Sequence, residues 1–202
     1  MLSPTTLLCV EDAVEITLVL AGAAIGFRLL GRLGIRRFAT CPASAAHALA
    51  VMLLLTASAH FVPASVTAMP NHADLVRMVP PLVPLPDATV YATGVLEVLG
   101  ALGLVLGATR RAAALSLAAL FVVLLPANIY AALAAVPFQG AEASPLWLRI
   151  PEQALYIGVT LWVARSAARA WAPSLSDPLR SRLRGPRRHS TLRVQSPTRR
   201  AA

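Results

Sequence analysis

Five long stretches of apolar residues, separated by short polar or charged segments, dominate the pattern along this chain. They cover residues 13–30, 43–61, 88–108, 112–136 and 150–164. Each approaches the roughly 20 residues that an α-helix needs to cross the hydrocarbon core of a bilayer. The fourth stretch has no charged residue, whereas Glu15 and Arg28 interrupt the first near its two ends. The pattern predicts an all-α, polytopic membrane bundle of five spans, of which the first has the weakest pattern.

Composition supports a membrane location. Hydrophobic residues make up 57% of the 202 residues and charged residues only 13%, with a mean hydropathy of +0.67. A soluble domain usually has about a quarter charged residues, because its surface must face water. The composition therefore excludes a water-soluble globule, and the lipid bilayer is the first expected partner.

The net charge of +9 is concentrated in the last part of the chain. Eight of the 18 basic residues, all of them arginines, follow Pro173, where Asp177 is the only acid. A nucleic-acid-binding domain would spread its arginines over a folded face, so no nucleic acid partner is expected. Residues 169–202 are predicted to be a disordered basic tail that attracts anionic phospholipids.

The distribution of arginine also predicts the orientation in the membrane, because loops rich in Arg stay cytoplasmic. Sixteen arginines lie after the first, third and fifth spans, on one predicted side. Only Arg77 and Arg149 lie on the other side. The rule therefore predicts an amino terminus outside and a cytoplasmic carboxyl terminus.

Polar side chains inside the spans are costly to bury and are candidates for function. Glu97 lies near the middle of residues 88–108, on one face with Gly94 and Gly100, which lets another helix approach closely. Proton or ligand handling and a structural hydrogen bond are equally supported for Glu97. Asn128 follows Pro126, so support of a helix kink is the better interpretation there.

Two further groups of polar residues lie near the predicted outer surface. Arg149, Gln153, Tyr156 and Thr160 form one stripe at helical spacing, and His60 lies at the end of its span. With the predicted orientation, the candidate residues fall in the outer half of the bilayer and predict an outward-facing polar pocket, with an Arg149–Glu97 pair through an intervening group. The candidate pocket comprises His60, Glu97, Asn128, Arg149, Gln153 and Tyr156.

Residues 63–87 form the longest connection between spans and are rich in proline. The run from His72 to Met78 predicts a short interfacial helix beside the pocket mouth. The outer-loop candidates are Arg77, Met78, Pro80 and Pro81. The spacing of histidines and methionines matches no metal or haem template, so no metal site is expected.

Five short motifs occur in order within residues 43–164: His60-Phe61, Met78-Val79-Pro80-Pro81, Thr93-Gly94-Val95-Leu96-Glu97, Pro126-Ala127-Asn128-Ile129-Tyr130 and Arg149-Ile150-Pro151-Glu152-Gln153. Together they resemble the DoxX-like family of small bacterial membrane proteins. The resemblance implies a four-helix membrane core in residues 43–168, in the plasma (inner) membrane of a bacterium. Residues 1–42 would then add an N-terminal span and an Arg-rich cytoplasmic loop. The resemblance to the DoxX-like family also implies a connection to redox biology, since founding members are subunits of a thiosulfate:quinone oxidoreductase.

The leading functional hypothesis is therefore a membrane subunit of a redox assembly that works with a partner protein. Quinone would bind in the pocket, where Arg149 and Gln153 would hydrogen-bond its oxygens, Glu97 would relay protons and His60 would line the mouth. No self-contained catalytic motif is present, and a Cys-x-x-Cys pair is absent. A small-solute transporter or permeability factor, and a structural membrane anchor for a partner, are the alternatives.

Overall fold

The computed structural model describes residues 4–139, 141–142 and 144–183, and it is almost entirely helical. The chain divides into two units, residues 1–168 and 169–202, and the bundle described below belongs to the first. Its elements are α1 (Pro4–Arg32), η1 (Arg36–Phe38), α2 (Cys41–Ser58), α3 (His72–Met78), α4 (Pro86–Val105), α5 (Arg110–Leu133), β1 (Pro137–Phe138), β2 (Ala141–Glu142) and α6 (Leu146–Leu183). β1 and β2 form a small antiparallel hairpin.

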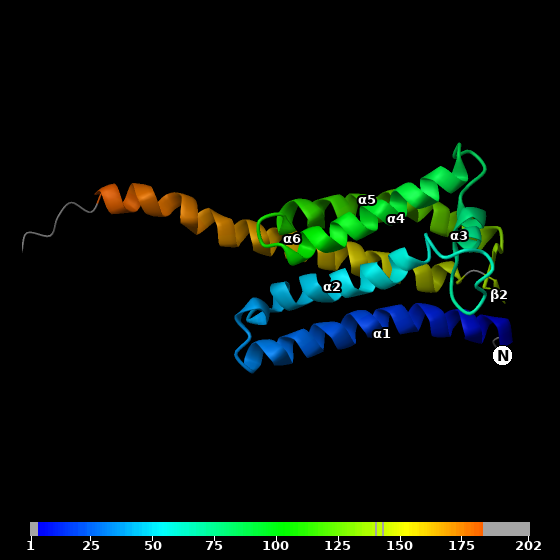
Figure 1. The fold of residues 1–202 in the computed structure, drawn as a ribbon, viewed down its shortest axis with the longest axis horizontal. Helices are drawn as coiled ribbons and strands as arrows, with labels where there is room; N and C mark the ends of the chain where they lie inside the picture. The colour runs from blue at the N-terminus through cyan, green and yellow to red at the C-terminus, as the bar shows by residue number, and fades with distance from the viewer. Residues whose placement is uncertain (1–3, 140, 143, 184–202) are drawn as a thin grey trace, which may run out of the picture. The chain divides into compact units, whose positions relative to one another are not determined.

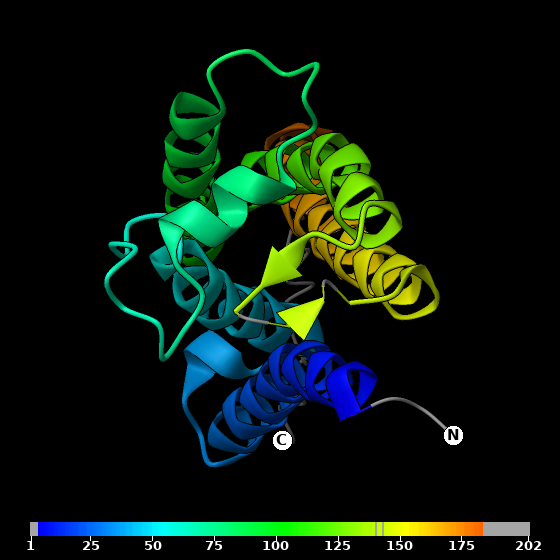
Figure 2. The ribbon, with the colours of Figure 1, turned by 90° about the vertical axis from the view of Figure 1, so that its right-hand side faces the viewer.

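The long helices pack side by side in chain order (Figure 1). α1 lies against α2, α2 against α4, and α4 against α5. Tyr156 and Val163 of α6 share one buried cluster with Leu49 of α2 and Leu117 and Phe121 of α5, so α6 also contributes to the core. Figure 2 shows this bundle end-on, with α3 and the hairpin lying across its end.

Within the described residues, three helices are long and apolar enough to cross a membrane, namely α2, α4 and α5. The predictions of a helical fold and of a membrane protein are therefore confirmed, and the predicted second, third and fourth spans correspond to these helices. The predicted spans at 13–30 and 150–164 lie within α1 and α6, which are not among the three. That these two helices also cross the membrane remains a prediction.

The exposed surface of α4 shows why the bilayer is the expected solvent. Leu99 and Leu102 are 58% and 53% exposed, whereas the carboxylate-bearing Glu97 is 6% exposed. A surface helix of a soluble protein would bury the leucines and expose the carboxylate. The small residues Gly94 and Gly100 lie on the same buried face as Glu97, as the sequence predicts.

α3 begins and ends where the sequence predicts. The Asn71 side chain accepts a hydrogen bond from the Asp74 backbone N–H, and the Asp74 side chain accepts one from Asn71, which forms a capping box. Met78 is buried against Ala131 and Val136, so the helix is docked on the bundle. The connection to α4 ends at Leu85, which has a φ of 54°, and Pro86 then starts α4 with a φ suited to a first helical turn.

Candidate functional site

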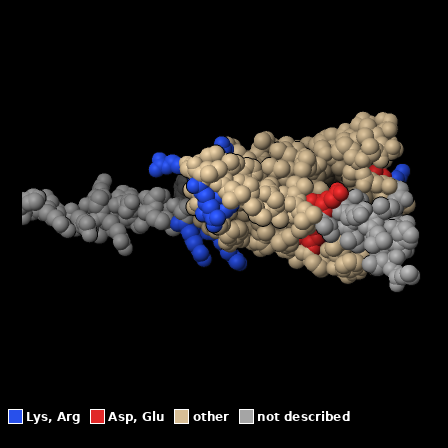
Figure 3. Space-filling view, turned by 90° about the horizontal axis from the view of Figure 1, so that it is seen from below, with Lys and Arg blue, Asp and Glu red and all other residues tan. Residues whose placement is uncertain are grey.

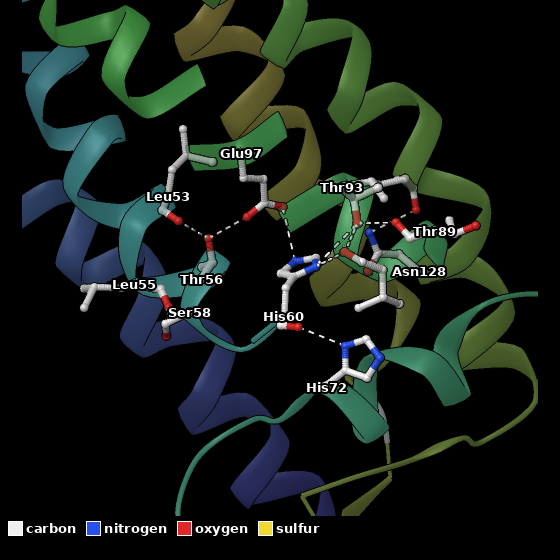
Figure 4. Close-up of polar contacts among 12 residues, drawn as sticks. Leu53, Leu55, Thr56, Ser58, His60, His72, Thr89, Thr93, Glu97 and Asn128 are labelled. Atoms are coloured by element: carbon white, nitrogen blue, oxygen red, sulfur yellow. Dashed lines mark hydrogen bonds and ion pairs between the residues drawn. The ribbon is translucent and has the colours of Figure 1, made fainter. Parts of the chain in front are cut away.

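A cluster of polar side chains lies between α2 and α4, in otherwise apolar surroundings (Figure 4). His60, just after the end of α2, places its Nε2 3.7 Å from Oε1 of Glu97 in the middle of α4. The Thr56 hydroxyl in the last turn of α2 lies 3.3 Å from the second carboxyl oxygen, Oε2. Both ionisable side chains are buried, with His60 7% and Glu97 6% exposed. We call this the Glu97–His60 pair.

Gly94 allows the two helices to bring this pair together. A Cβ atom at Gly94 would lie 2.5 Å from the Cβ of His60 and 2.7 Å from its Cγ. The missing side chain lets the imidazole lie directly against α4, where its Nδ1 is 2.7 Å from the Val90 carbonyl oxygen. Gly94 is one helical turn before Glu97. The close approach of His60 to α4 at Gly94 therefore also sets the distance between the imidazole ring and the Glu97 carboxyl group.

The contact with Val90 determines which nitrogen of His60 faces Glu97 as a free acceptor. A carbonyl oxygen can only accept, so Nδ1 carries a proton and donates it to Val90. In a neutral ring Nε2 then presents a lone pair to Glu97, and the contact is attractive only if one further proton lies on the carboxyl group or on the ring. An attractive contact between the two side chains therefore needs one proton, on Nε2 or on Oε1.

Burial favours the neutral form of the pair, because both side chains are largely removed from water. The Thr56 hydroxyl has a single proton and two acceptors within reach, Oε2 of Glu97 at 3.3 Å and the Leu53 carbonyl at 3.2 Å. A proton on Oε1 of Glu97, directed at Nε2, makes the contact with His60 attractive while the imidazole stays neutral.

A second layer of titratable residues covers His60. The Nδ1 of His72 is 2.9 Å from the backbone oxygen of His60, and its Nε2 is 3.2 Å from Oδ1 of Asp87. The backbone oxygen of His60 can only accept, so Nδ1 of His72 donates to it. The ring also stacks on Tyr91, with centroids 4.1 Å apart. This layer ties α3 to the beginning of α4.

The polar stripe predicted on α6 forms its own cluster. Nη1 of Arg149 lies 3.4 Å from Oε2 of Glu152, and the Tyr156 hydroxyl donates to Oε1 of Glu152 at 2.8 Å. An Arg149–Glu97 pair through an intervening group stays a prediction, and no direct contact between the two is found among the described residues. The reason is local, since Glu152 is three residues from Arg149 on the same helix, whereas Glu97 is occupied by His60 and Thr56. Gln153 is buried, and in the described part of the chain its Oε1 has no hydrogen-bond partner.

The hydrogen bond of Asn128 lies within α5, outside both clusters. Its Nδ2 donates to the carbonyl of Leu124, one turn earlier in α5, at 3.3 Å. This is consistent with the interpretation of kink support beside Pro126, although the carbonyl whose partner Pro126 removes is that of Val122.

The outer-loop candidates serve to position α3. Arg77 pairs with Asp74 at 3.1 Å, Met78 is buried on the bundle, and Pro80 and Pro81 follow the helix. No group of three or more His, Cys, Asp or Glu side chains comes together as a metal site within the described residues.

Two of the partners were missed by reasoning from the sequence. The expectations from the sequence do not include the ion pairs of Glu152 with Arg149 and of Asp74 with Arg77. In both cases an acidic and a basic residue three positions apart on a predicted helix are the signal that could have found them.

The comparisons with known proteins correct the family suggested by the five motifs. No curated protein and no solved structure matches the chain. The family model that matches, over residues 49–164, describes a domain of unknown function, DUF8561. The resemblance to the DoxX-like family is therefore wrong, and the four-helix core and redox role that it implied lose that support. The match covers more than half of the chain, so the protein belongs to the DUF8561 family.

Proposed function

We propose that this protein is a membrane protein that binds and exchanges a proton at the Glu97–His60 pair, as part of the permeation of protons or proton-coupled small solutes. The observation that carries the proposal is the 3.7 Å contact between Nε2 and Oε1, with Nδ1 committed to Val90. That arrangement requires one proton that either partner can hold.

The position of Glu97 within the apolar helices supports a functional role for this proton. Apart from Asp87 in the first turn of α4, it is the only acidic residue in the three helices α2, α4 and α5. A charge in apolar surroundings is expensive, so an intramembrane carboxyl group is by default a candidate for a proton or ligand pathway. Moving the proton from Glu97 to His60 converts a neutral pair into an ion pair, which changes the attraction between α2 and α4.

Proteoliposomes containing only this protein and an internal pH-sensitive dye test the proposal. We expect wild-type protein to dissipate an imposed pH gradient faster than protein-free vesicles, and Glu97→Gln to return the rate to the protein-free value. The amide keeps the size and hydrogen-bonding capacity of the side chain but cannot release a proton in the pH range of the assay.

Asp87→Asn is the matched control, because it removes a carboxylate whose side chain is 74% exposed at the beginning of the same helix. It should retain most of the wild-type rate. A wild-type rate equal to that of empty vesicles, or a Glu97→Gln variant as fast as the wild type, would contradict the proposal.

A second candidate function rests on Gln153. Its buried Oε1 is an acceptor without a partner among the described residues, so it suits a ligand that brings a hydroxyl donor, such as a quinol. Trp147, which is exposed near the start of α6, provides a fluorescence signal. If quinol binds, a short-chain naphthoquinol should quench this fluorescence saturably in the wild type, and Gln153→Leu should weaken binding about tenfold. The variant Gln139→Leu is the control, because it makes the same change of side chain at another position. Equal quenching in the wild type and in both variants would contradict quinol binding at Gln153.

A further inference from the structure

Two arginines from separate elements converge on the carboxyl end of α4. Arg110 of α5 donates from Nε to the Leu104 carbonyl at 2.8 Å and from Nη2 to the Val105 carbonyl at 3.3 Å. Arg37 of η1 donates from Nη2 to the same Val105 oxygen, also at 3.3 Å. Two guanidinium groups are thus held on one acceptor, at the end of the bundle opposite the Glu97–His60 pair.

A histidine holds Arg37 in place without contributing charge. Nδ1 of His47 lies 2.7 Å from the Ala43 carbonyl and must donate to it, so Nε2 is the acceptor for Nε of Arg37 at 3.0 Å. A proton on Nε2 would abolish that hydrogen bond, so the geometry requires a neutral ring. Phe27 and Phe38 pack around the imidazole and fix its orientation.

The charges of the two arginines are only partly balanced. The ion pairs recorded for the described residues involve Arg77 and Arg149, not Arg37 or Arg110. The C-terminus of α4 offers about half a negative charge from its helix dipole. Among the described residues, no acidic side chain pairs with the remaining positive charge. Figure 3 shows that further arginines gather at this end of residues 1–168 while acidic residues lie toward the other.

We propose that Arg37 and Arg110 form a binding site for the phosphate of an anionic phospholipid headgroup. Guanidinium groups recognise phosphate through paired N–H donors, and this site lies where the spans α4 and α5 end and begin. Exposed apolar residues lie close to the arginines in the sequence: Leu33, 81% exposed, is four residues before Arg37, and Leu106, 56% exposed, is four before Arg110. These side chains suit the glycerol and acyl region of a lipid, which free phosphate lacks.

The first test compares ligands on the full-length wild-type protein in detergent. Added phosphatidylglycerol is expected to raise the thermal unfolding temperature, whereas phosphatidylcholine and inorganic phosphate at the same concentration leave it unchanged. Equal stabilisation by phosphatidylcholine, or by inorganic phosphate, would overturn a site for an anionic lipid.

The second test separates this site from general attraction to positive charge, including that of the arginine-rich tail. Arg37→Gln/Arg110→Gln is compared with Arg36→Gln/Arg111→Gln, which removes the same charge at adjacent, exposed positions. Phosphatidylglycerol affinity, measured by native mass spectrometry, should fall about tenfold or more in the first pair and less than about threefold in the second. Equal losses in both pairs would overturn the proposal. The single variants Arg110→Gln and Arg111→Gln provide the same comparison if the double variant does not fold.

Discussion

Replacing Gly94 by alanine is expected to lower the free energy of unfolding by about 1–3 kcal/mol and to disrupt the Glu97–His60 pair. The added Cβ would lie 2.5 Å from the Cβ of His60, an atom near the backbone that cannot rotate away. The end of α2 and α4 must therefore separate, and the imidazole must move with its backbone. The variant should unfold at a lower denaturant concentration in mixed micelles and lose proton exchange in proteoliposomes.

Gly158→Ala is the matched control for Gly94→Ala. A Cβ at Gly158 would meet no atom within 4 Å, so alanine there should be neutral or stabilising by up to about 1 kcal/mol through its higher helix propensity. Because the chemical change is identical, the difference between the two variants measures the contact with His60. If both variants were equally stable, the close approach of His60 to α4 would not exist in the folded protein.

Leu104→Ala is expected to be the most destabilising truncation, by about 2–5 kcal/mol, whereas Leu102→Ala should cost less than about 1 kcal/mol. Leu104 is fully buried in the bundle, and Leu102, two residues earlier in α4, is 53% exposed on the face turned away from it. Inside a bilayer the hydrophobic effect does not distinguish these sites, because lipid tails are as apolar as leucine. The loss at Leu104 comes from van der Waals contacts that no lipid can replace in a buried cavity.

Equilibrium unfolding of the two variants in mixed micelles measures this difference. The wild type and Leu99→Ala, a second change on the exposed face, complete the series. A loss at Leu102 or Leu99 as large as the loss at Leu104 would contradict the assignment of that face to lipid.

The helices that the sequence predicted best are those whose structure depends on local features. The uncharged stretch 112–136 lies mostly within α5, which runs from Arg110 to Leu133. The prolines between Pro80 and Pro86 keep the chain before α4 out of a helix. The run from His72 to Met78 forms α3 because Asn71 and Asp74 cap it through neighbouring backbone groups. Such signals act within a few residues, so they can be recognised without knowledge of the fold.

The candidate site was predicted less completely, because its pairing depends on distances between helices. The small residues beside Glu97 predicted that it faces the bundle, and the structure places it there. The direct neighbours were not specified by the sequence: Glu97 lies beside His60 and Thr56, and Arg149 contacts Glu152. The family was predicted wrongly, because short motifs of common membrane residues carry less information than a match along residues 49–164.

By itself, the sequence determined that this is a helical membrane protein with Glu97 inside an apolar stretch and most of its arginines outside such stretches, because hydropathy and charge are properties of each stretch of chain. Only the tertiary structure decided that His60 lies against Glu97 and that Arg37 joins Arg110 at the end of α4. His60 and Glu97 are 37 positions apart in the sequence, and Arg37 and Arg110 are 73 positions apart. Both contacts depend on how closely the helices approach one another. Glycine and alanine at the interfaces permit this approach, but no local pattern specifies it.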